Sequence, residues 1–481
     1  MGGWDRVLTL LWALPAAGAL AVALGGRRVQ WLAPLAAAVA FVLSLTLWPH
    51  AGSAQVSVPW FRGPFGSLAT YSLAGSGLSL LLSGLALLCT ALCTAAAGRY
   101  GPGCVAWLAA LGAAATGMFL ARDLVLFYLF WEAMLVPTYF LLLGWGGEGR
   151  ARAAWRFLVY NIGGSVLLLL GIAALLAFGV GMPGGPGGGT VPAAAVGPIA
   201  LALIIAFAVK TPLFPVHGWV GDTYAELPAP AAALVSAVQS KAGLYGMLAI
   251  LLPLMPGGTS AWAPALIAAG IVSVFYGGFL ALATDEPRRL LAYSSISHLG
   301  LVAVAFATQI SLAVTGGVIA LIAHGLVVAP LFLLVGMLED RLGRPLHLRD
   351  LGGLARSAPG VAGALTLLGM AALGLPGLAT FPAELLMLVG VFHYSGWLAI
   401  AGAGGLVLAA VYVLRLVQLV LHGPAATPAA DLRAPERWLL APFAALLLLL
   451  GLYPHPVPAL AGPAVTAAAA VPGPAQGGNA P

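Results

Sequence analysis

Long apolar runs, each about the length of a membrane-spanning helix, follow one another along almost the whole 481-residue chain. Apolar side chains make up 61% of the residues and charged side chains only 7%. A water-soluble protein carries roughly 25% charged residues, which solvate its surface. The chain therefore has to fold in lipid, and this excludes a soluble catalytic lobe, a dinucleotide-binding domain or a nucleic-acid module. The excess of arginine is typical of membrane-protein loops, so no nucleic-acid partner is expected.

Clusters of Arg, Pro and Gly bound the apolar runs, which predict an all-α polytopic membrane protein with about fourteen transmembrane helices. The expected helices cover residues 7–24, 30–49, 77–97, 104–121, 122–144, 154–179, 196–216, 229–252, 261–283, 288–308, 313–338, 360–394, 397–421 and 436–453.

Two of these runs contain prolines that should interrupt the helix. Residues 360–394 would form a helix of about 52 Å, too long for a hydrocarbon core of about 30 Å, so the twelfth helix should be discontinuous. Pro376 and Pro382 mark its break. The seventh helix should also be discontinuous, because Pro212 and Pro215 follow Lys210. Such paired breaks, five helices apart, are typical of inverted repeats that place a transport path at the breaks.

The breaks predict a division of the chain into four parts. These are three N-terminal helices with their loops, a first five-helix repeat (helices 4 to 8), a second inverted five-helix repeat (helices 9 to 13), and a last helix with a Pro/Gly/Ala tail that we expect to be disordered. Their bounds are residues 1–103, 104–252, 253–421 and 422–481.

The arginines predict the orientation in the membrane. When successive loops are assigned to alternating sides, fifteen arginines fall on one face, and only Arg6, Arg62 and Arg122 fall on the other. The majority face should be cytoplasmic by the positive-inside rule. Both termini are then expected outside.

Lysine is used differently from arginine in this chain. Its only two lysines, Lys210 and Lys241, both lie within apolar helices, whereas arginine supplies the surface cations. Buried lysine can release a proton and arginine hardly can, so we expect both lysines to titrate. The alternative is a lysine that reaches the membrane surface or neutralises a structural carboxylate.

Glu132 lies about ten residues, or about 15 Å, into the fifth helix, near the middle of the bilayer. A charge there is costly, which makes it a candidate functional group. A Glu132–Lys210 ion pair is the simplest account of both groups, since each would then control the proton affinity of the other.

Three further titratable residues lie in otherwise apolar surroundings. His298 and His324 are on separate helices and can shuttle protons near neutrality; the alternatives are two core histidines or a pair of haem ligands. Glu384 follows the break of the twelfth helix, where a carboxylate can meet water and suits proton release. The alternative for Glu384 is a cap of the second half-helix.

Five segments resemble the antiporter-like membrane subunits of respiratory complex I, the proton-translocating NADH:quinone oxidoreductase. They are ARDLVLFYLFWEAMLVPTYFLLLGWGG (121–147), VKTPLFPVHGWVGDTYAELPAP (209–230), RRLLAYSSISHLGLV (288–302), AHGLVVAPLFLLVG (323–336) and GLPGLATFPAELLMLVG (374–390). The resemblance covers roughly residues 77–425. Glutamate at position 384, where the L-type and N-type subunits usually have lysine, resembles the M-type subunits.

The resemblance implies a role for each candidate. Glu132 and Lys210 would be a modulating ion pair, and Lys241, His298 and His324 a proton relay. Glu384 would then release the proton to the outside.

The resemblance also implies the setting of the chain. It would lie in the bacterial inner membrane beside L-type and N-type subunits, exchange protons and hold no cofactor, while NADH, FMN, iron–sulfur clusters and quinone would be bound by partner subunits. One departure is the stretch Val220-Gly221-Asp222-Thr223-Tyr224, where the family usually has a Leu-Pro-Asp-Ala-His motif, which puts the role of that loop in doubt.

Other functions stay open from the sequence. Subunits of multisubunit Na⁺/H⁺ antiporters and of membrane-bound hydrogenases share this helix core. A stand-alone solute transporter is a further alternative, but the breaks carry titratable groups and no cluster of donors and acceptors suited to an organic solute.

Overall fold

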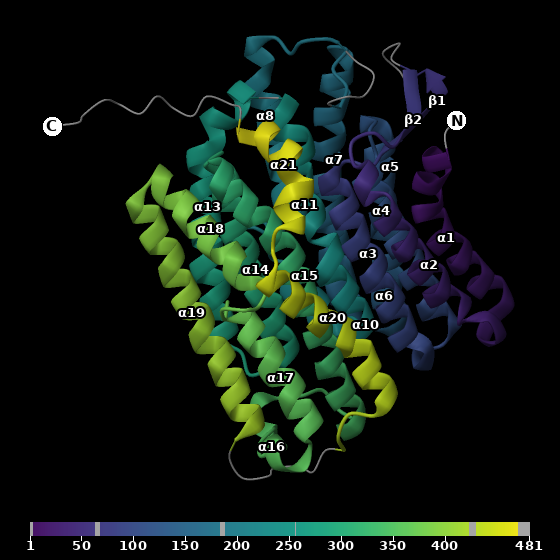
Figure 1. Ribbon diagram of the computed structural model, residues 1–481, viewed down its shortest axis with the longest axis vertical. Coiled ribbons are helices and arrows are strands. Elements are labelled where there is room, and N and C mark those ends of the chain that lie inside the picture. Colours follow the sequence, from purple (N-terminus) through teal and green to yellow (C-terminus); the bar gives the residue numbers. More distant parts are fainter. Residues whose placement is uncertain (1–2, 63–67, 183–187, 255, 423–429, 470–481) are drawn as a thin grey trace.

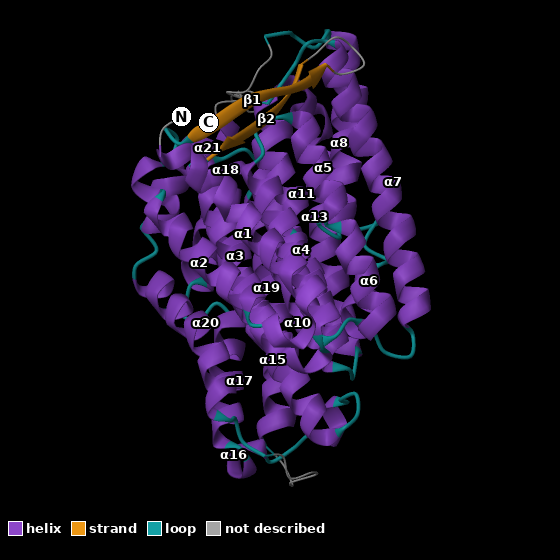
Figure 2. Ribbon diagram, turned by 90° about the vertical axis from the view of Figure 1, so that its right-hand side faces the viewer, coloured by secondary structure: helices purple, strands orange, loops and turns teal. Residues whose placement is uncertain are grey.

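The computed structural model describes residues 3–62, 68–182, 188–254, 256–422 and 430–469, and it consists largely of long helices that run side by side (Figure 1; Figure 2). The helices up to the middle of the chain are α1 (Gly3–Gly25), α2 (Leu32–Thr46), α3 (Gly77–Ala96), α4 (Pro102–Leu120), α5 (Leu124–Ala133), α6 (Leu135–Trp145), α7 (Arg150–Ala177), α8 (Ala193–Lys210), α9 (Val220–Glu226), α10 (Ala229–Leu234) and α11 (Lys241–Gly246). The remaining helices are α12 (Leu252–Leu254), α13 (Pro256–Ala283), α14 (Pro287–Ala307), α15 (Ser311–Leu342), α16 (Leu354–Ser357), α17 (Pro359–Ala372), α18 (Thr380–Tyr394), α19 (Gly396–Leu421), α20 (Ala434–Leu452) and α21 (Pro456–Ala469).

The described helices up to α20 form fourteen apolar segments, and the short apolar helix α21 follows them. Twelve are long and apolar enough to span a membrane, with α5 and α6 counted as one segment and α10 to α12 as another. The shorter α2 adds a thirteenth segment, and α17 with α18, which follow each other across a break, add a fourteenth. The prediction of an all-α membrane fold with about fourteen spans is confirmed.

One end of the bundle carries most of the ion pairs between loops. Arg99 pairs with Asp340, Arg288 with Glu339, and Arg341 with Glu436, which ties the ends of α3, α14, α15 and α20 together. We call this the arginine-rich end. It lies at the side of α16, opposite to the end where α1 begins and α21 ends (Figure 1).

Helix α15 lies in the centre of the bundle. It is 32 residues long, and its most apolar window is buried on all sides, as expected for a helix that is apolar all round. Gly316 allows α18 to approach closely, since a Cβ at this position would lie 2.5 Å from the backbone nitrogen of Met387. Helix α15 therefore brings the second half of the broken twelfth segment against the middle of the bundle.

Both predicted breaks are present, and their freed backbone groups find partners. The seventh segment stops being helical at Lys210, earlier than expected, because the prolines that follow cannot continue a helix. Leu213 N then donates to Ala208 O (2.9 Å), and the Trp219 indole donates to Val209 O (3.0 Å). In the twelfth segment Thr380 Oγ1 donates to Ala371 O. Such pairing is required because non-helical backbone inside a membrane has to be satisfied by protein or water.

The fifth and eighth segments are less regular than the sequence predicts. The fifth is interrupted at Met134, because Pro137 has no N–H to donate one turn back. The eighth contains two π-helical turns, Val235–Gln239 and Met247–Leu251, on either side of α11. π-Turns widen a helix locally and often occur at functional sites.

Two elements of the fold were not predicted from the sequence. Strands β1 (Gln55–Arg62) and β2 (Leu68–Ala74) form an antiparallel hairpin at the end of the bundle opposite to the arginine-rich end (Figure 2). Asp123 fixes the hairpin, since its buried carboxylate accepts from the backbone N–H (3.3 Å) and hydroxyl (3.2 Å) of Thr70 and also caps α5. An all-α prediction could not include it, because short strands give a weak signal beside apolar helices.

The second missed element is α21, which occupies part of the stretch that was predicted to be a disordered tail. Helix α21 packs against α15 and α3, where Gly77 leaves room for the backbone of Leu460. Residues 456–469 are therefore helical, which corrects the prediction for them. The Pro/Gly/Ala residues 470–481 lie outside the described residues.

Candidate functional site

Lys241 lies at the start of α11 and is completely buried. Its ammonium nitrogen contacts three partners from two helices: Ser236 O at 2.6 Å, Ser240 Oγ at 3.3 Å and His324 Nδ1 at 2.7 Å. The π-turn that precedes Lys241 places Ser236 where its carbonyl oxygen also accepts from Ser240 Oγ (2.7 Å). Lysine and histidine at hydrogen-bond distance can pass a proton directly, since lysine donates and neutral imidazole accepts.

His324 connects Lys241 to a second histidine. Its ring and the ring of His298 on α14 have centroids 6.0 Å apart and are tilted by 58°. His298 Nε2 in turn lies 3.4 Å from the hydroxyl of Tyr412 on α19. Within the described part of the chain, His324 Nε2 has no hydrogen-bond partner, although it is buried. This ring nitrogen of His324 is therefore free to bind a proton or a water molecule.

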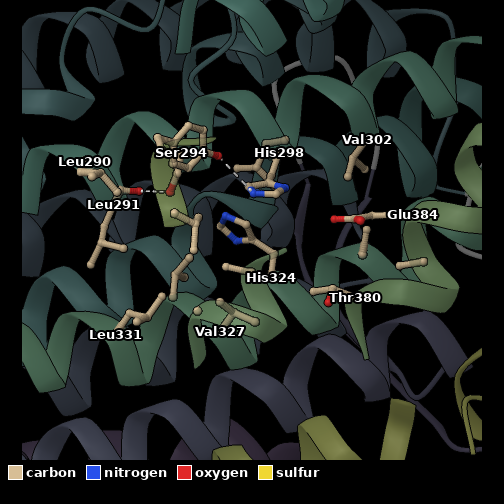
Figure 3. A pocket seen from close by; sticks show the side chains of 18 of the residues that line it. Leu290, Leu291, Ser294, His298, Val302, His324, Val327, Leu331, Thr380 and Glu384 are labelled. Carbon is tan, nitrogen blue, oxygen red and sulfur yellow. Dashed lines mark hydrogen bonds between the residues drawn. The ribbon is translucent and has the colours of Figure 1, made fainter. Parts of the chain in front are cut away.

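A cavity joins the two histidines to Glu384 (Figure 3). It has a volume of about 40 Å³, and its polar lining residues are Ser294, His298, His324, Thr380, Glu384 and Tyr412. The volume counts the space open to the centre of a water molecule, and one water needs about 10–15 Å³ of it. A few water molecules therefore fit in this cavity. Water between His298 and Glu384 would complete a hydrogen-bonded path, because both groups face the same space.

The break of the twelfth segment positions Glu384. The carboxylate lies in the second turn of α18, and Gly374 provides the room for it: a Cβ at Gly374 would lie 2.9 Å from the Glu384 carboxyl carbon. Gly374 also has a φ of +69°, which glycine adopts without strain. The Gly374 turn therefore gives the glutamate access to the histidine cavity.

The expected direct ion pair between Glu132 and Lys210 is not formed. Among the described residues the Lys210 ammonium has no hydrogen-bond or salt-bridge partner, and it lies 4.9 Å from the ring centroid of Trp131. Successive residues of a helix point about 100° apart, so Trp131 faces the bundle interior while Glu132 is turned toward its half-buried side. A cation–π contact replaces the predicted salt bridge, and Glu132 acts on Lys210 from a greater distance.

The six candidates thus form two groups. Lys241, His324, His298 and Glu384 lie along one path of contacts and cavity, whereas Lys210 contacts the ring of Trp131, the residue that precedes Glu132. Trp131, Ser236 and Tyr412 complete these groups and were missed from the sequence. A tryptophan directly before the only acidic residue of an apolar helix was the signal available for Trp131; Tyr412 had none, because it lies in an ordinary apolar run.

A polar vestibule opens at the arginine-rich end. This cavity of about 750 Å³ lies between the α6–α7 and α15–α16 connections, α9 and the start of α14, and its charged lining includes Glu148, Glu226, Glu286, Arg288, Arg289 and Glu339. Several of these groups are paired: Arg289 with Glu286 (2.9 Å) and with Asp222 (2.8 Å), and Arg288 with Glu339. The vestibule therefore offers a polar, charged surface at one end of the eighth segment.

The sequence is similar to those of known membrane subunits. Residues 121–409 match the family described as NADH:quinone oxidoreductase/Mrp antiporter, TM. The chain is 32% identical to the NADH-quinone oxidoreductase subunit M of Rhodobacter capsulatus, over 96% of each chain. It is 33% identical to the subunit of the same name from Escherichia coli (strain K12), over 90% of this chain and 91% of that one.

Solved structures share the fold. A chain of the respiratory complex I from Thermus thermophilus with bound NADH has a TM-score of 0.89 and 31% identity, covering 97% of this chain and all of that one. A chain of the Mrp complex from Dietzia sp. DQ12-45-1b has a TM-score of 0.84 over 98% of each chain, at 21% identity, which is a likeness of fold alone.

Proposed function

This chain belongs to the NADH:quinone oxidoreductase/Mrp antiporter transmembrane family, and we infer that it moves protons across the membrane as a membrane-arm subunit of an NADH:quinone oxidoreductase. The single observation that carries the mechanism is the buried contact between Lys241 Nζ and His324 Nδ1, 2.7 Å long, beside a cavity that contains Glu384. This arrangement suits a proton relay because each group can both hold and release H⁺.

The proposed path runs through the second half of the bundle. Lys241 passes its proton to His324, and the proton moves on through His298 and cavity water to Glu384. Glu384 then releases it at the side opposite to the arginine-rich end. This direction is supported by the place of Glu384 in α18, the half of the twelfth segment that leads away from the arginine-rich end (Figure 1; Figure 3).

Glu132 and Lys210 have a different proposed role. Among the described residues, neither Glu132 nor Lys210 contacts Lys241 or His324 directly. We therefore propose that their charges act on this pair through the electric field. A change of charge at Glu132 alters how strongly the buried Lys210 holds its proton. The charge of Lys210 in turn biases the proton affinity of Lys241 on the neighbouring helix α11. Electron transfer in partner subunits would drive the change, while this chain holds no redox centre.

The setting is proposed with the function. L-type and N-type subunits would flank the chain in a bacterial inner membrane, and the NADH, FMN, iron–sulfur clusters and quinone would belong to other subunits. The related alternative, a subunit of a Na⁺/H⁺ antiporter assembly, is supported only by the likeness of fold to the Mrp complex. Mass spectrometry of the intact assembly distinguishes the two, because only the first contains NADH-oxidising subunits.

Replacing Lys241 by Arg tests the relay. Arginine keeps the positive charge but does not release its proton, so we expect NADH-driven proton pumping by the reconstituted complex to fall by at least tenfold. The measurement is the initial rate of acidification in proteoliposomes, normalised to the amount of assembled complex. Pumping at the normal rate with Lys241→Arg would show that fixed charge is sufficient, and the relay would have to be abandoned.

A further inference from the structure

Tyr224 directly precedes a stretch of chain that lines the polar vestibule. It belongs to α9, and the next three residues, Ala225, Glu226 and Leu227, line the vestibule. Its own side chain is completely buried. The ring is held by Trp219 and by Phe332 of α15, both in nearly perpendicular contact at centroid distances of 6.1 and 5.9 Å. The ring position is therefore fixed, and only the hydroxyl hydrogen can rotate.

The hydroxyl of Tyr224 is a buried polar group without a hydrogen bond of normal geometry to any described residue. The side chains of Ser240 and Ser236 are polar neighbours of this hydroxyl. A buried hydroxyl without a partner costs about 1–3 kcal/mol, and such groups are rare in native proteins unless they have a function.

The two serines lead directly to Lys241. Ser236 accepts from the Lys241 ammonium through its carbonyl oxygen (2.6 Å), and Ser240 accepts through its hydroxyl (3.3 Å). Ser236 Oγ also contacts Ser295 Oγ of α14 at 3.3 Å. A chain of hydroxyl groups thus extends from Lys241 toward α9 and reaches Tyr224.

The charged side chains of α9 are already engaged, and the buried hydroxyl of Thr223 is the other polar group of this helix that lacks a partner among the described residues. Asp222 pairs with Arg156 and Arg289, and the carbonyl groups of Ala225 and Leu227 accept from Arg288. Glu226 accepts from the backbone N–H of Gly149. Of the two hydroxyl groups of α9 that lack a partner among the described residues, that of Tyr224 lies beside the side chains of Ser236 and Ser240.

We propose that the Tyr224 hydroxyl passes protons from vestibule water to Lys241. After Lys241 has given its proton to His324, its neutral amine accepts a proton from Ser240, which takes one from Tyr224, which takes one from water of the vestibule. The vestibule water takes up an H⁺ from the aqueous phase as it donates one. Each oxygen therefore forms one O–H bond and breaks one, so the water and the hydroxyl groups end unchanged and the amine gains one H⁺. This assignment rests on the proposed function and adds the residue through which protons reach the relay.

Replacing Tyr224 by Phe removes only the hydroxyl oxygen. In the complete complex, reconstituted in proteoliposomes, we expect NADH-driven pumping to fall by at least tenfold while the amount of assembled complex stays normal. Tyr245→Phe is the matched control, because Tyr245 is equally buried but its hydroxyl donates to Phe119 O (2.6 Å), away from the serines. The control should pump at the normal rate.

Tyr224→His separates a relay from a packing role, since imidazole can accept a proton at one nitrogen and donate it from the other. We expect this variant to recover a large part of the pumping that Tyr224→Phe loses. Normal pumping by Tyr224→Phe, or an equal loss with Phe and His, would overturn the assignment. If Lys241→Arg pumps poorly while Tyr224→Phe pumps normally, the assignment of Tyr224 fails and the proposed function stands; if both pump normally, the proposed function fails as well.

Discussion

At the scale of single residues, the two buried lysines differ in what surrounds them. Lys241 has three polar partners, one of which is a histidine, and can hand its proton on at once. Lys210 faces the ring of Trp131 and no hydrogen-bonding group among the described residues. An ammonium over a tryptophan ring is stabilised by about 2 kcal/mol when both are desolvated. Trp131 therefore holds the charge of Lys210 in place where a carboxylate would have neutralised it.

Replacing Trp131 by Leu should show whether this contact matters. Without the ring, the charged form of Lys210 loses its main stabilising contact, and we expect pumping to fall several-fold. The measurement is proton pumping by the reconstituted complex. Trp131→Phe keeps an aromatic face and should retain most of the activity; if Leu and Phe have the same effect, the cation–π contact has no role in pumping.

At the scale of elements, broken helices and caps decide where the site residues lie. The first residues of α17, which lead to the second break, are fixed by Asp431, whose carboxylate accepts from Gly360 N (3.0 Å) and Val361 N (2.9 Å). Partial burial raises the pKa of Asp431, but the backbone N–H groups and the Arg437 guanidinium outweigh it and hold the pKa below its usual value. A carboxylate at a helix N-terminus also stabilises the helix dipole.

The cap predicts a pH dependence. Because the pKa of Asp431 is lower in the folded protein, its stabilising effect is complete above the pKa of an unfolded chain and is lost as the pH falls through the folded-state value. Asp431→Ala should destabilise the start of α17 by about 1 kcal/mol at neutral pH. Hydrogen exchange of residues 360–364 measures this, and the difference from the unmodified protein should shrink at acid pH. Equal exchange at pH 7 would show that the cap is not needed.

At the scale of the whole molecule, the start of α1 and the end of α21 lie at the same end of the bundle, opposite to the arginine-rich end (Figure 1). The arginine-rich end gathers the ion pairs Arg99–Asp340, Arg288–Glu339 and Arg341–Glu436. If it faces the cytoplasm, as the positive-inside rule predicts, the vestibule also opens there and Glu384 is directed to the outside.

Reporter fusions test this orientation. Alkaline phosphatase attached to the C-terminus should be active, because it folds only outside the cytoplasm, and green fluorescent protein at the same place should stay dark. The two reporters serve as controls for each other. A fluorescent and phosphatase-negative pair of fusions would reverse the orientation and, with it, the proposed direction of proton movement.

The amino-acid sequence by itself determined the number of spans, both breaks and the buried titratable residues. These features are local: a run of apolar residues has to cross the bilayer, proline interrupts it at a known place, and a lysine or glutamate inside it is recognisable from its neighbours. The division into inverted repeats, which these local features suggested, stays a prediction.

Only the tertiary structure decided which of those residues meet. The contact of Lys241 with His324 depends on a π-turn and on the packing of α15, and the contact of Trp131, rather than Glu132, with Lys210 depends on the rotation of α5 about its axis. The β-hairpin and α21 also form by packing against distant parts of the chain. Local patterns specify which segments enter the membrane, but the contacts between segments depend on the relative rotation, depth and irregularities of helices that are far apart in the sequence.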